Sequence, residues 1–497
     1  MDKDFGLDIE NFGDKDKKLI LSAYEFAKNA HRGQKRLSGD DYIIHPITVA
    51  KSLISLGLDA STVSAGLLHD VPEDTDFSID DIKKNFSDEI ANLVLGVTKV
   101  NKIRIKKDWY EAESTDIDTF YSFPRQIAVL QRMFIAMSED IRVILIKLCD
   151  RLHNMQTIEF LPESKKMRIA RETLEIFAPL ADRLGIGVIK GELEDLSFPI
   201  AHPKEYQKLK KDFGKTYEFR KTYVKRMKKY LQKELYEVGV AAEIHGRAKF
   251  LYSLFKKLKK YDGTTSRIYD LVALRVIVND VKDCYAVLGY IHQLFKPLPT
   301  KIKDYIAMPK PNGYQSIHTT VFGLEGQIIE IQIRTFEMHE HAEYGVAAHW
   351  HYTKQVGPKE EIEKKGIFAP KKDLDWTKEL ADWQKKAETS QDFKELKNEF
   401  FQDRIFVFTP KGDVCDLPFG ATTIDFAYWI HTDLGNNCAG AKVNGKMVEL
   451  SFKLSNGDIV EIITRKNTYG PKRDWLNFVK TSQAKMHIKQ YLLKKVI

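Results

Sequence analysis

The sequence predicts a multidomain protein of the α and α+β classes: an all-helical region, a mixed α/β region and a small β-grasp-like module, in that order. Three observations support this prediction. Apolar residues recur at helical spacing through roughly the first 200 residues, without a clear two-residue alternation. Two alternating runs joined by a glycine turn lie within 316–333, which is the pattern of a hairpin. Short strands and turn signals return after Arg404.

The composition is that of a folded protein in water. Hydrophobic residues make up 43% and charged residues 30% of the 497 residues, which allow about three or four domains. Lysine and arginine number 78 against 70 acidic residues, which permits a polyanionic partner without requiring one. The four cysteines lack CxxC spacing and favour reduced thiols in a cytoplasmic protein. The acidic N-terminus and the absence of a long apolar run predict neither a signal peptide nor a membrane helix.

In the first region, apolar spacing predicts helices at 19–30, 47–56, 61–68, 141–152 and 170–184. Histidine and aspartate recur beside them, as His45, the adjacent pair His69 and Asp70, and Asp150. The simplest interpretation is structural, because a lone histidine or aspartate on a helix usually has no ligand. If the four converge within one bundle, two imidazoles and two carboxylates suit a divalent ion with open water positions. Manganese fits such a set better than a closed zinc site does.

The mixed α/β region follows a basic helix over 201–240, which we interpret as solvated rather than as a nucleic-acid surface. The β-branched run IYDLVALRVIV (268–278) predicts a buried central strand, and a helix is expected over 283–295. Asp270 and Arg275 interrupt the apolar strand. A buried charge costs free energy unless it is paired or bound to a metal, so these residues indicate either a core ion pair or a ligand site.

The stretch KIKDYIAMPKPNGYQSIHTTVFGLEGQIIEIQIRT (301–335) contains the predicted hairpin, with strands at 316–322 and 327–333. Lysines and a tyrosine precede a strand on which Glu330 and Gln332 share one face. This set suits a phosphate-rich nucleotide: lysine for phosphates, tyrosine for a base, and glutamate for a metal or a hydroxyl proton. The alternative is a solvated edge hairpin without a ligand.

The C-terminal part begins with a charged segment, 355–400, whose Leu, Trp and Phe at helical spacing predict a linker of amphipathic helices. From Arg404 we expect a strand, a Pro-Lys-Gly turn and a second strand, followed by a helix that Thr422 or Thr423 caps. AKVNGKMVEL contains an Asn-Gly turn, which is a strong hairpin signal. These elements together predict the small β-grasp-like module.

A family resemblance accompanies these patterns. KDYIAMPKPNGYQSIHTTV, followed by EIQIRT and HAEYGVAAHW, resembles the synthetase domain of the RelA/SpoT homologue family, whose members make and degrade (p)ppGpp. HRGQKRLSG, YIIHP, LLHDVPEDT and LCDRLHNMQT resemble the family's HD-type hydrolase domain, and the small module resembles its TGS domain. The resemblance implies a hydrolase domain at 1–200, a nucleotidyltransferase-like synthetase domain at 201–354, a helical linker at 355–400, a TGS domain at 401–466 and the start of a helical regulatory segment at 467–497. Long members continue well past that segment.

In the hydrolase domain, the resemblance implies that His45, His69, Asp70 and Asp150 hold Mn²⁺. It further implies that Glu73 and Asp74 activate water, and that the nucleotide is contacted by Arg36, Tyr42, Asn154 and Thr157. The sequence departs from the family at Pro72, where Val is usual, at Ala128 and Val129, where Glu and Asn are usual, and at Asp182, where His is usual. Pro72 should disfavour helical geometry at Val71 and remove a backbone donor, so we expect these changes to bear on hydrolytic efficiency.

In the synthetase domain, the resemblance implies that Asp270 binds Mg²⁺ and that Glu330 acts on the metal and on the attacking hydroxyl. Arg247 and Arg275 would hold the adenine and phosphates of ATP. Phosphate contacts would come from Lys249, Ser253, Lys257, Lys303 and Lys310. The guanine would be held by Asn312 and a stacked Tyr314, with His318 and Gln332 lining the site. KIKD at 301–304 resembles the basic form of this motif found in bifunctional members.

The sequence therefore predicts a bifunctional stringent-response enzyme, which transfers pyrophosphate from ATP to the 3′-hydroxyl of GDP or GTP and hydrolyses (p)ppGpp. Its expected partners are these nucleotides and the ribosome or tRNA, reached through the TGS-like module, where His431 is the RNA-contacting candidate. No membrane partner is expected. Two alternatives remain open. The complete set of His and Asp ligands favours a hydrolase-dominant protein, whereas Pro72 and Ala128 argue against it. The TGS-like module favours an RNA-binding sensor whose enzymatic sites are degenerate, whereas the intact Asp270 and Glu330 argue against it.

Overall fold

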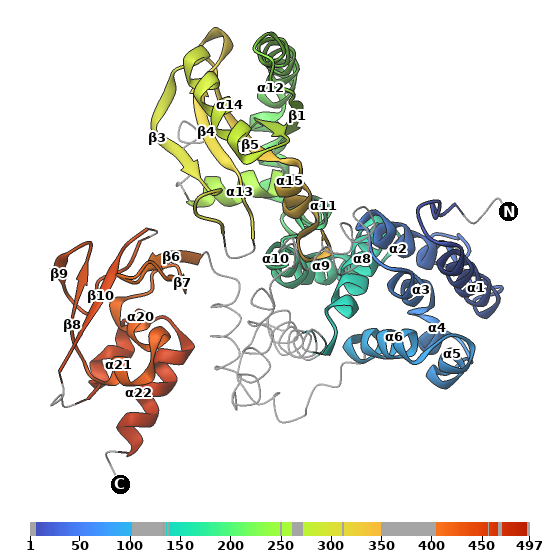
Figure 1. Cartoon of the computed structure of the whole chain (residues 1–497). Coiled ribbons are helices and arrows are strands. Elements are labelled where there is room, and N and C mark those ends of the chain that lie inside the picture. Colours follow the sequence, from blue (N-terminus) through green and yellow to red (C-terminus); the bar gives the residue numbers. More distant parts are fainter. Residues whose placement is uncertain are drawn as a thin grey trace. The chain divides into compact units, whose positions relative to one another are not determined.

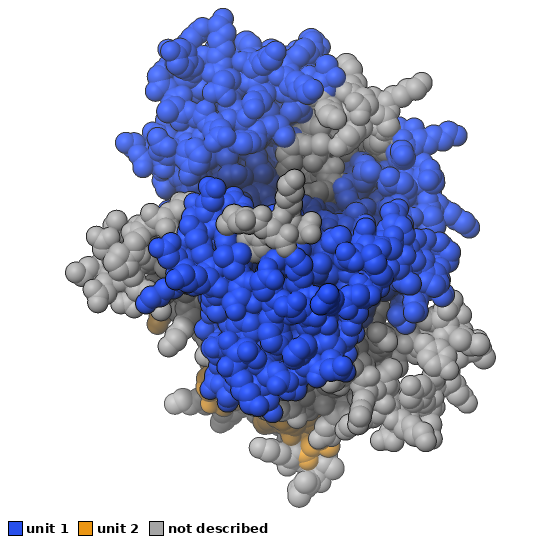
Figure 2. All heavy atoms as spheres, turned by 90° about the vertical axis from the view of Figure 1, so that its right-hand side faces the viewer, with its two compact units in different colours: residues 1–105, 114–381 blue, residues 106–113, 382–497 orange. Residues whose placement is uncertain are grey.

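The computed structural model describes residues 6–101, 133, 136, 139–248, 251–260, 272–310, 313–348, 404–455, 457–465 and 470–494. The chain divides into two compact units, distinguished by colour in Figure 2: residues 1–105 with 114–381, and residues 106–113 with 382–497. The expected linker helices at 355–400 lie outside the described residues. Within the described ranges, no helix is both long and apolar enough to cross a membrane.

The N-terminal part of the first unit is helical, as the apolar spacing predicts (Figure 1). Its described elements are α1 (Asp14–Ala30), α2 (Ile44–Ser55), α3 (Ala60–Leu68), α4 (Val71–Asp74), α5 (Ile79–Asn85), α6 (Asp88–Asn101), α8 (Ile141–Gln156), η2 (Ile158–Phe160), α9 (Glu163–Glu172), η3 (Thr173–Phe177), α10 (Ala178–Arg183) and α11 (Gly187–Ala201). Side chains fix where helices begin: Asp59 accepts from the amide of Thr62 at 2.8 Å, and Asp140 accepts from the amide of Arg142 at 2.9 Å.

The expected helix at 170–184 is not continuous. Residues Thr173–Phe177 form the π-helical turn η3, and α10 begins directly after it. The cause is Pro179 in the first turn of α10, because proline offers no amide hydrogen to the preceding turn. The wider π turn before the proline accommodates the missing hydrogen bond, so the helical backbone continues into α10.

The second part of the first unit is a five-stranded sheet with helices. Its described elements are α12 (Pro203–Glu237), β1 (Glu243–Ala248), α13 (Leu251–Lys260), β2 (Val272–Val278), α14 (Val281–Leu294), β3 (Pro297–Asp304), β4 (Ile317–Phe322), η5 (Leu324–Gly326), β5 (Ile328–Thr335), α15 (Phe336–Tyr344) and η6 (Gly345–Ala347). The strand order is β1-β2-β5-β4-β3. Among the described strands of this sheet, only β2 and β5 pair in parallel. The described part of the predicted central strand, Val272–Val278, lies inside the sheet as β2, and β4 and β5 form the predicted hairpin.

Strand alternation gives this sheet one apolar and one polar face. Leu274, Val276 and Ile331 belong to the buried core that α12 and α14 cover. The register pairs Arg275 with Gln332 between β2 and β5, Gln332 with His318 between β5 and β4, and His318 with Lys303 between β4 and β3. Because paired residues project to the same side of a sheet, the polar residues of four strands share the face opposite the core.

The second unit carries the predicted small module. Its described elements are β6 (Arg404–Phe408), β7 (Val414–Pro418), α20 (Thr423–Ile430), α21 (Thr432–Asn436), β8 (Cys438–Val443), β9 (Lys446–Val448), β10 (Val460–Thr464), η7 (Arg473–Asn477) and α22 (Ser482–Lys494). Thr422 caps α20 in a capping box with Asp425, as the sequence indicates. The turn between β8 and β9 places Asn444 and Gly445 at φ 51° and 79°, which explains the Asn-Gly pair.

Candidate active sites

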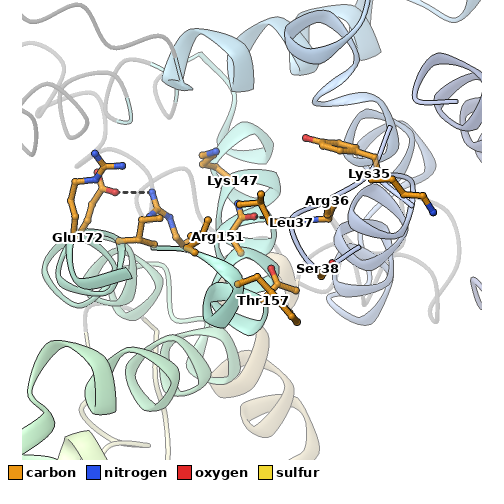
Figure 3. Close-up of a pocket in the computed structure, with 14 residues that line it drawn as sticks. Lys35, Arg36, Leu37, Ser38, Lys147, Arg151, Thr157 and Glu172 are labelled. Atoms are coloured by element: carbon orange, nitrogen blue, oxygen red, sulfur yellow. Dashed lines mark hydrogen bonds and ion pairs between the residues drawn. The ribbon is translucent and has the colours of Figure 1, made fainter. Parts of the chain in front are cut away.

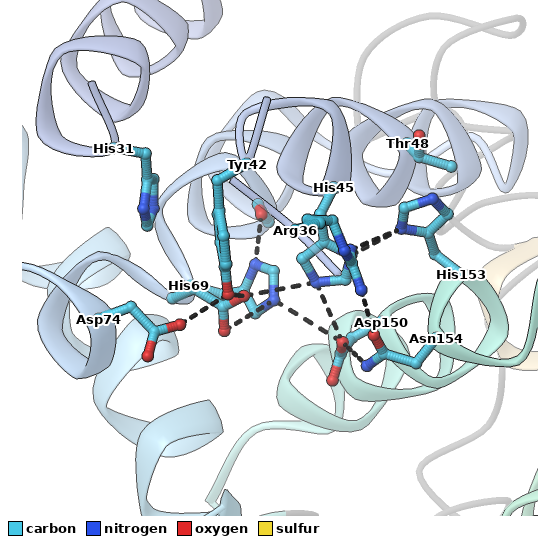
Figure 4. A network of polar contacts seen from close by, with 12 residues as sticks. His31, Arg36, Tyr42, His45, Thr48, His69, Asp74, Asp150, His153 and Asn154 are labelled. Carbon is cyan, nitrogen blue, oxygen red and sulfur yellow. Dashed lines mark hydrogen bonds and ion pairs between the residues drawn. The ribbon is translucent and has the colours of Figure 1, made fainter. Parts of the chain in front are cut away.

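The helical part of the first unit brings His45, His69, Asp70 and Asp150 together. Figure 4 labels three of them, His45, His69 and Asp150. His45 lies on α2, His69 and Asp70 follow α3, and Asp150 lies on α8. The Nε2 atom of His45 is 3.4 Å from Asp70 Oδ2 and 3.2 Å from Asp150 Oδ1. The Nε2 atom of His69 is 3.2 Å from Asp70 Oδ1 and 3.9 Å from Asp150 Oδ1. The four residues predicted as metal ligands therefore converge in this structure.

Both imidazoles are oriented for a cation. The Nδ1–H of His69 donates to the carbonyl of Gly66 at 2.8 Å, so its Nε2 carries the lone pair. His45 uses its own Nδ1 toward His153 Nδ1 at 2.6 Å, which again turns Nε2 to the carboxylates. His69 is fully buried, and its Nε2 has no hydrogen-bond partner among the described residues. A buried acceptor without a partner costs about 1–3 kcal/mol, which a bound cation would offset. Ligand atoms of three of these residues lie within 4.8 Å of one another, so the donor set fits a divalent ion.

Both carboxyls of this cluster are held ionised. Burial alone would raise their pKa values, but neighbouring basic side chains outweigh burial. At Asp70 these groups are His69 and His45, and at Asp150 they are Lys147 and His45, so both pKa values fall below the ordinary range. Conversely, burial would lower the pKa of His45, and the two aspartates raise it instead. The cluster thus attracts positive charge, whether a proton or a metal ion supplies it.

Predicted water-activating and nucleotide-binding residues surround the cluster. The hydroxyl of Tyr42 donates to Asp74 Oδ2 at 2.6 Å and to Asp70 Oδ2 at 3.0 Å. Figure 4 shows Asp74 pointing toward this hydroxyl. Glu73 is exposed on the same short helix. A carboxylate tied to a metal-ligand candidate through one tyrosine is placed for proton transfer beside the cluster.

A second set of contacts joins α8 to the loop after α1. Asn154 donates to Asp150 Oδ1 at 2.6 Å and accepts from Arg36 Nη2 at 3.0 Å. The hydroxyl of Thr157 donates to the carbonyl of His153 at 3.0 Å. The predicted nucleotide contacts Arg36, Asn154 and Thr157 therefore lie together beside the cluster.

A cavity of about 460 Å³ adjoins these residues (Figure 3). It is lined by Lys35, Arg36, Leu37, Ser38, Tyr42, Lys147, Arg151, Asn154, Thr157, Phe160, Leu161, Arg168, Ile169 and Glu172. Five of these side chains are cationic, and the single carboxylate, Glu172, already accepts from Arg151 at 3.0 Å. A cavity with such an excess of positive charge suits a ligand rich in phosphate.

Sequence reasoning missed four cationic residues of this cavity, namely Lys35, Lys147, Arg151 and Arg168. One signal existed for Lys147, which precedes Asp150 by three residues and therefore shares its helix face and its ion pair. Lys35, Arg151 and Arg168 could not be predicted, because they reach the cavity only through the packing of α8 against the loop after α1 and against α9.

The expectation that Pro72 disfavours helical geometry at Val71 is wrong. Val71 is helical and buried, and Pro72 occupies the first turn of α4. The first-turn amides of a helix have no intrahelical acceptor, so proline removes no bond there. The next two amides, of Glu73 and Asp74, still donate to the carbonyl of Asp70 at 3.1 and 3.0 Å. The backbone beside the cluster is therefore intact.

The other departures from the family are less informative. Ala128 and Val129 lie outside the described residues. Asp182 is exposed on α10, where its Oδ1 accepts from Lys190 at 2.8 Å.

The polar face of the sheet brings together several predicted synthetase residues. Glu330 Oε1 accepts from Gln332 at 2.8 Å and lies 3.4 Å from His318 Nδ1. The other ring nitrogen of His318 is 2.7 Å from the hydroxyl of Tyr314. Lys310 Nζ lies 4.8 Å from the centre of the Tyr314 ring. Burial raises the pKa of Tyr314 and lowers that of Lys310, so this site partly excludes water.

Two arginines and a carboxylate lie on the same face. Arg275 Nη1 contacts Glu343 Oε1 of α15 at 2.7 Å, and Arg334 Nη2 is 3.4 Å from the same oxygen. Arg275 was predicted, whereas Arg334 and Glu343 were missed. The alternation of EIQIRT placed Arg334 on the face of Glu330 and Gln332, and it was the available signal.

The remaining predicted synthetase residues differ in their placement. Lys303 is exposed on β3, paired with His318. The backbone of Arg247 pairs with Ala273 of β2. The hydroxyl of Ser253 on α13 donates to Glu194 of α11 at 3.3 Å. Lys257 is half-buried on α13, and three residues, Lys249, Asp270 and Asn312, lie outside the described residues.

Comparison with known proteins gives three family models that match the chain. They are an HD domain over residues 23–187, a region found in RelA/SpoT proteins over 246–357 and a TGS domain over 405–464. These matches confirm the predicted succession of a helical HD-type domain, a mixed α/β domain and a TGS module.

Curated relatives match almost the whole chain. A guanosine-3′,5′-bis(diphosphate) 3′-pyrophosphohydrolase from Aquifex aeolicus is 46% identical over 96% of this chain and 64% of its own length. A GTP pyrophosphokinase from Streptomyces antibioticus is 44% identical over 96% of this chain and 56% of its own. A bifunctional (p)ppGpp synthase/hydrolase RelA from Mycobacterium tuberculosis is 42% identical over 96% and 63%. The chain thus spans less than two thirds of the length of these relatives.

Proposed function

Since the chain belongs to the RelA/SpoT homologue family, we propose that it both makes and degrades (p)ppGpp as an enzyme of the stringent response. In synthesis, it transfers pyrophosphate from ATP to the 3′-hydroxyl of GDP or GTP. In hydrolysis, it releases pyrophosphate from the 3′ position of (p)ppGpp. The observation that carries the proposal is the convergence of His45, His69, Asp70 and Asp150 beside a cationic cavity, in a chain that also carries the polar sheet face.

In the hydrolase site, Mn²⁺ bound by His45, His69, Asp70 and Asp150 would supply Lewis acidity to water and to a phosphate oxygen. Asp74 is the nearest carboxylate outside that set, and Tyr42 holds it by a hydrogen bond of 2.6 Å. Asp74, with Glu73 beside it, accepts the proton of the attacking water. The bond between the 3′-oxygen and phosphorus breaks, and pyrophosphate leaves.

The cavity supplies nucleotide binding for this reaction. Its cationic residues neutralise the diphosphates, which carry most of the charge of (p)ppGpp. Arg36 is tied through Asn154 to Asp150, so a phosphate bound by Arg36 lies next to the cluster. Leu37 and Phe160 provide apolar surface for the base.

In the synthetase site, the 3′-oxygen of GDP or GTP forms a bond to the β-phosphorus of ATP, and AMP leaves. Glu330 accepts the hydroxyl proton, and its contacts with Gln332 and His318 fix its orientation. Mg²⁺ held by Glu330 and Asp270 would neutralise phosphate charge. Positioning and electrostatics supply most of the catalysis in such transfers.

Substrate binding in this site is assigned from the family resemblance. Arg275, with Arg247, binds ATP, and Lys303 and Lys310 meet phosphates, as do Lys249, Ser253 and Lys257. Tyr314 and Asn312 hold guanine, and His318 and Gln332 line the pocket. The burial of Tyr314 and the nearby ammonium of Lys310 support a site for an anionic, aromatic ligand.

The second unit is assigned to RNA of the ribosome or tRNA. His431 supports this assignment, because its side chain is 66% exposed directly after α20. Trp429 and Ile430 are partly exposed beside it, which offers stacking surface next to a hydrogen-bonding ring. A cytoplasmic location follows from these partners.

One assay on the purified chain separates this proposal from its alternatives. ATP and GDP are supplied with Mg²⁺, and (p)ppGpp is supplied separately with Mn²⁺. A bifunctional enzyme forms (p)ppGpp in the first reaction and releases pyrophosphate in the second. Hydrolysis without synthesis would indicate the hydrolase-dominant alternative. Neither activity would leave the RNA-binding sensor as the better account.

A further inference from the structure

Helix α15 is held at both ends against the sheet and the helical part of the same unit. At its start, Thr335 accepts from the amide of Met338 at 3.2 Å, so α15 begins where β5 ends. At its end, Gly345 has φ 55°, and a side chain there would collide with the carbonyl oxygen of Leu184. The amide of Val346 donates to that carbonyl at 3.0 Å. The backbone that carries Glu343 is therefore fixed.

Glu343 lies near the end of α15 and contacts two arginines of neighbouring strands. Its Oε1 is 2.7 Å from Arg275 Nη1 on β2 and 3.4 Å from Arg334 Nη2 on β5. Arg334 is only 1% exposed, whereas Arg275 is 8% exposed at the polar face. The same carboxylate thus joins an arginine at the site to an arginine behind it.

The charges of this group make Glu343 necessary for its arrangement. Two buried guanidinium groups on adjacent strands repel each other strongly at low dielectric, and a carboxylate between them offsets that repulsion. His339 adds no further positive charge at neutral pH. Burial first, and then Arg334, lower the pKa of His339 to about 4. Without Glu343, the Arg275 side chain would lose a charge-assisted contact of 2.7 Å that helps to set its direction.

We propose that Glu343 is a positioning residue for pyrophosphate transfer, which fixes the guanidinium of Arg275 in the orientation that binds ATP. The proposal rests on the synthetase function proposed above. Glu343 itself does not touch substrate. Its role differs from that of Lys303 and Lys310, which meet phosphates directly. The proposal predicts that loss of the Glu343 carboxylate raises KM for ATP and leaves KM for GDP nearly unchanged.

The test is Glu343→Gln, which keeps the size of the side chain and removes its charge. Glu337→Gln is the matched control, because Glu337 is exposed in the first turn of the same helix. Initial rates of synthesis are measured at varied ATP with saturating GDP, and then at varied GDP. Loss of a charge-assisted contact predicts a rise in KM for ATP of about ten- to a hundred-fold, with KM for GDP within two-fold of wild type. Hydrolysis of (p)ppGpp should be unchanged, which also reports that the chain is folded.

Four results would overturn the proposal. In folded Glu343→Gln, KM for ATP could stay within two-fold of wild type, or both Michaelis constants could rise equally. If that variant does not fold, Glu343→Asp takes its place, because it keeps the charge on a shorter side chain; an equal rise in both Michaelis constants of this folded variant would contradict the role. Should the wild-type chain transfer no pyrophosphate, calorimetry with a non-hydrolysable ATP analogue separates the two claims. The proposed function then fails, while weaker analogue binding by Glu343→Gln would still support the positioning role and equal binding would refute it.

Discussion

Tyr42→Phe isolates one hydroxyl of the proposed hydrolase site. The substitution removes the donor to Asp74 at 2.6 Å and to Asp70 at 3.0 Å, and it leaves the ring in place. That ring stacks on His31 with centroids 4.6 Å apart, so the variant should fold. Burial first, and then the charge of Asp70, raise the pKa of Tyr42 far above its ordinary value. The hydroxyl therefore remains a donor throughout the working pH range.

The magnitude follows from the two bonds that are lost. Asp74 is exposed, so water replaces much of the bond to its carboxylate. Asp70 is more enclosed, and a hydrogen bond to such a charged group contributes about 1.5–3 kcal/mol. If that energy orients Asp70 and Asp74 for the reaction, the rate constant of hydrolysis should fall about ten- to a hundred-fold.

The assay is the initial rate of pyrophosphate release from (p)ppGpp with Mn²⁺, measured for wild type and for Tyr42→Phe. Tyr236→Phe is the control, because Tyr236 is 83% exposed on α12. Synthesis from ATP and GDP by the same preparation should be unaffected. A hydrolytic rate within two-fold of wild type at every (p)ppGpp concentration would refute the assignment of Tyr42.

Other substitutions separate the two activities and test the remaining assignments. Glu330→Gln should abolish synthesis and leave hydrolysis intact, because the amide cannot accept the hydroxyl proton; appreciable synthesis by this variant would exclude Glu330 as the base. Tyr314→Ala should raise KM for GDP by about one to two decades through loss of base stacking, with KM for ATP little changed. Tyr314→Phe keeps the ring and should cost much less, so an equal loss in both variants would argue against stacking. Pro72→Val should leave hydrolysis within two-fold of wild type, since the first turn of α4 needs no donor there; a clear fall in rate would show that the proline is required.

The sequence predicted those features that depend on local periodicity. Helical spacing located α1, α2, α3 and α8, and the turn at 323–326 located the β4–β5 hairpin, where the amide of Gly323 donates to the carbonyl of Gln327 at 2.8 Å. Alternation placed Glu330 and Gln332 on one face, and their side chains are hydrogen-bonded at 2.8 Å. Composition and turn signals were sufficient for the module after Arg404.

Features that depend on packing between distant segments could not be predicted in this way. Arg151 belongs to the hydrolase cavity because α9 presents Glu172 to it, and no spacing within α8 contains that information. Glu343 reaches Arg275 only because β2 and β5 are parallel neighbours and α15 folds back over them. The backbone geometry at Val71 was misjudged because the effect of Pro72 on it depends on where α4 begins, which the sequence alone left undefined.

The central claim is that the His45, His69, Asp70 and Asp150 cluster is a metal site that carries hydrolysis, separate from the synthetase site. The most direct test is Asp70→Asn, with bound Mn²⁺ measured by elemental analysis and both activities measured on the same preparation. An amide of the same shape is a poorer ligand than a carboxylate, so Mn²⁺ bound per chain and hydrolysis should both fall sharply while synthesis continues at the wild-type rate. Unchanged hydrolysis and Mn²⁺ content in Asp70→Asn, or an equal loss of both activities, would contradict the account.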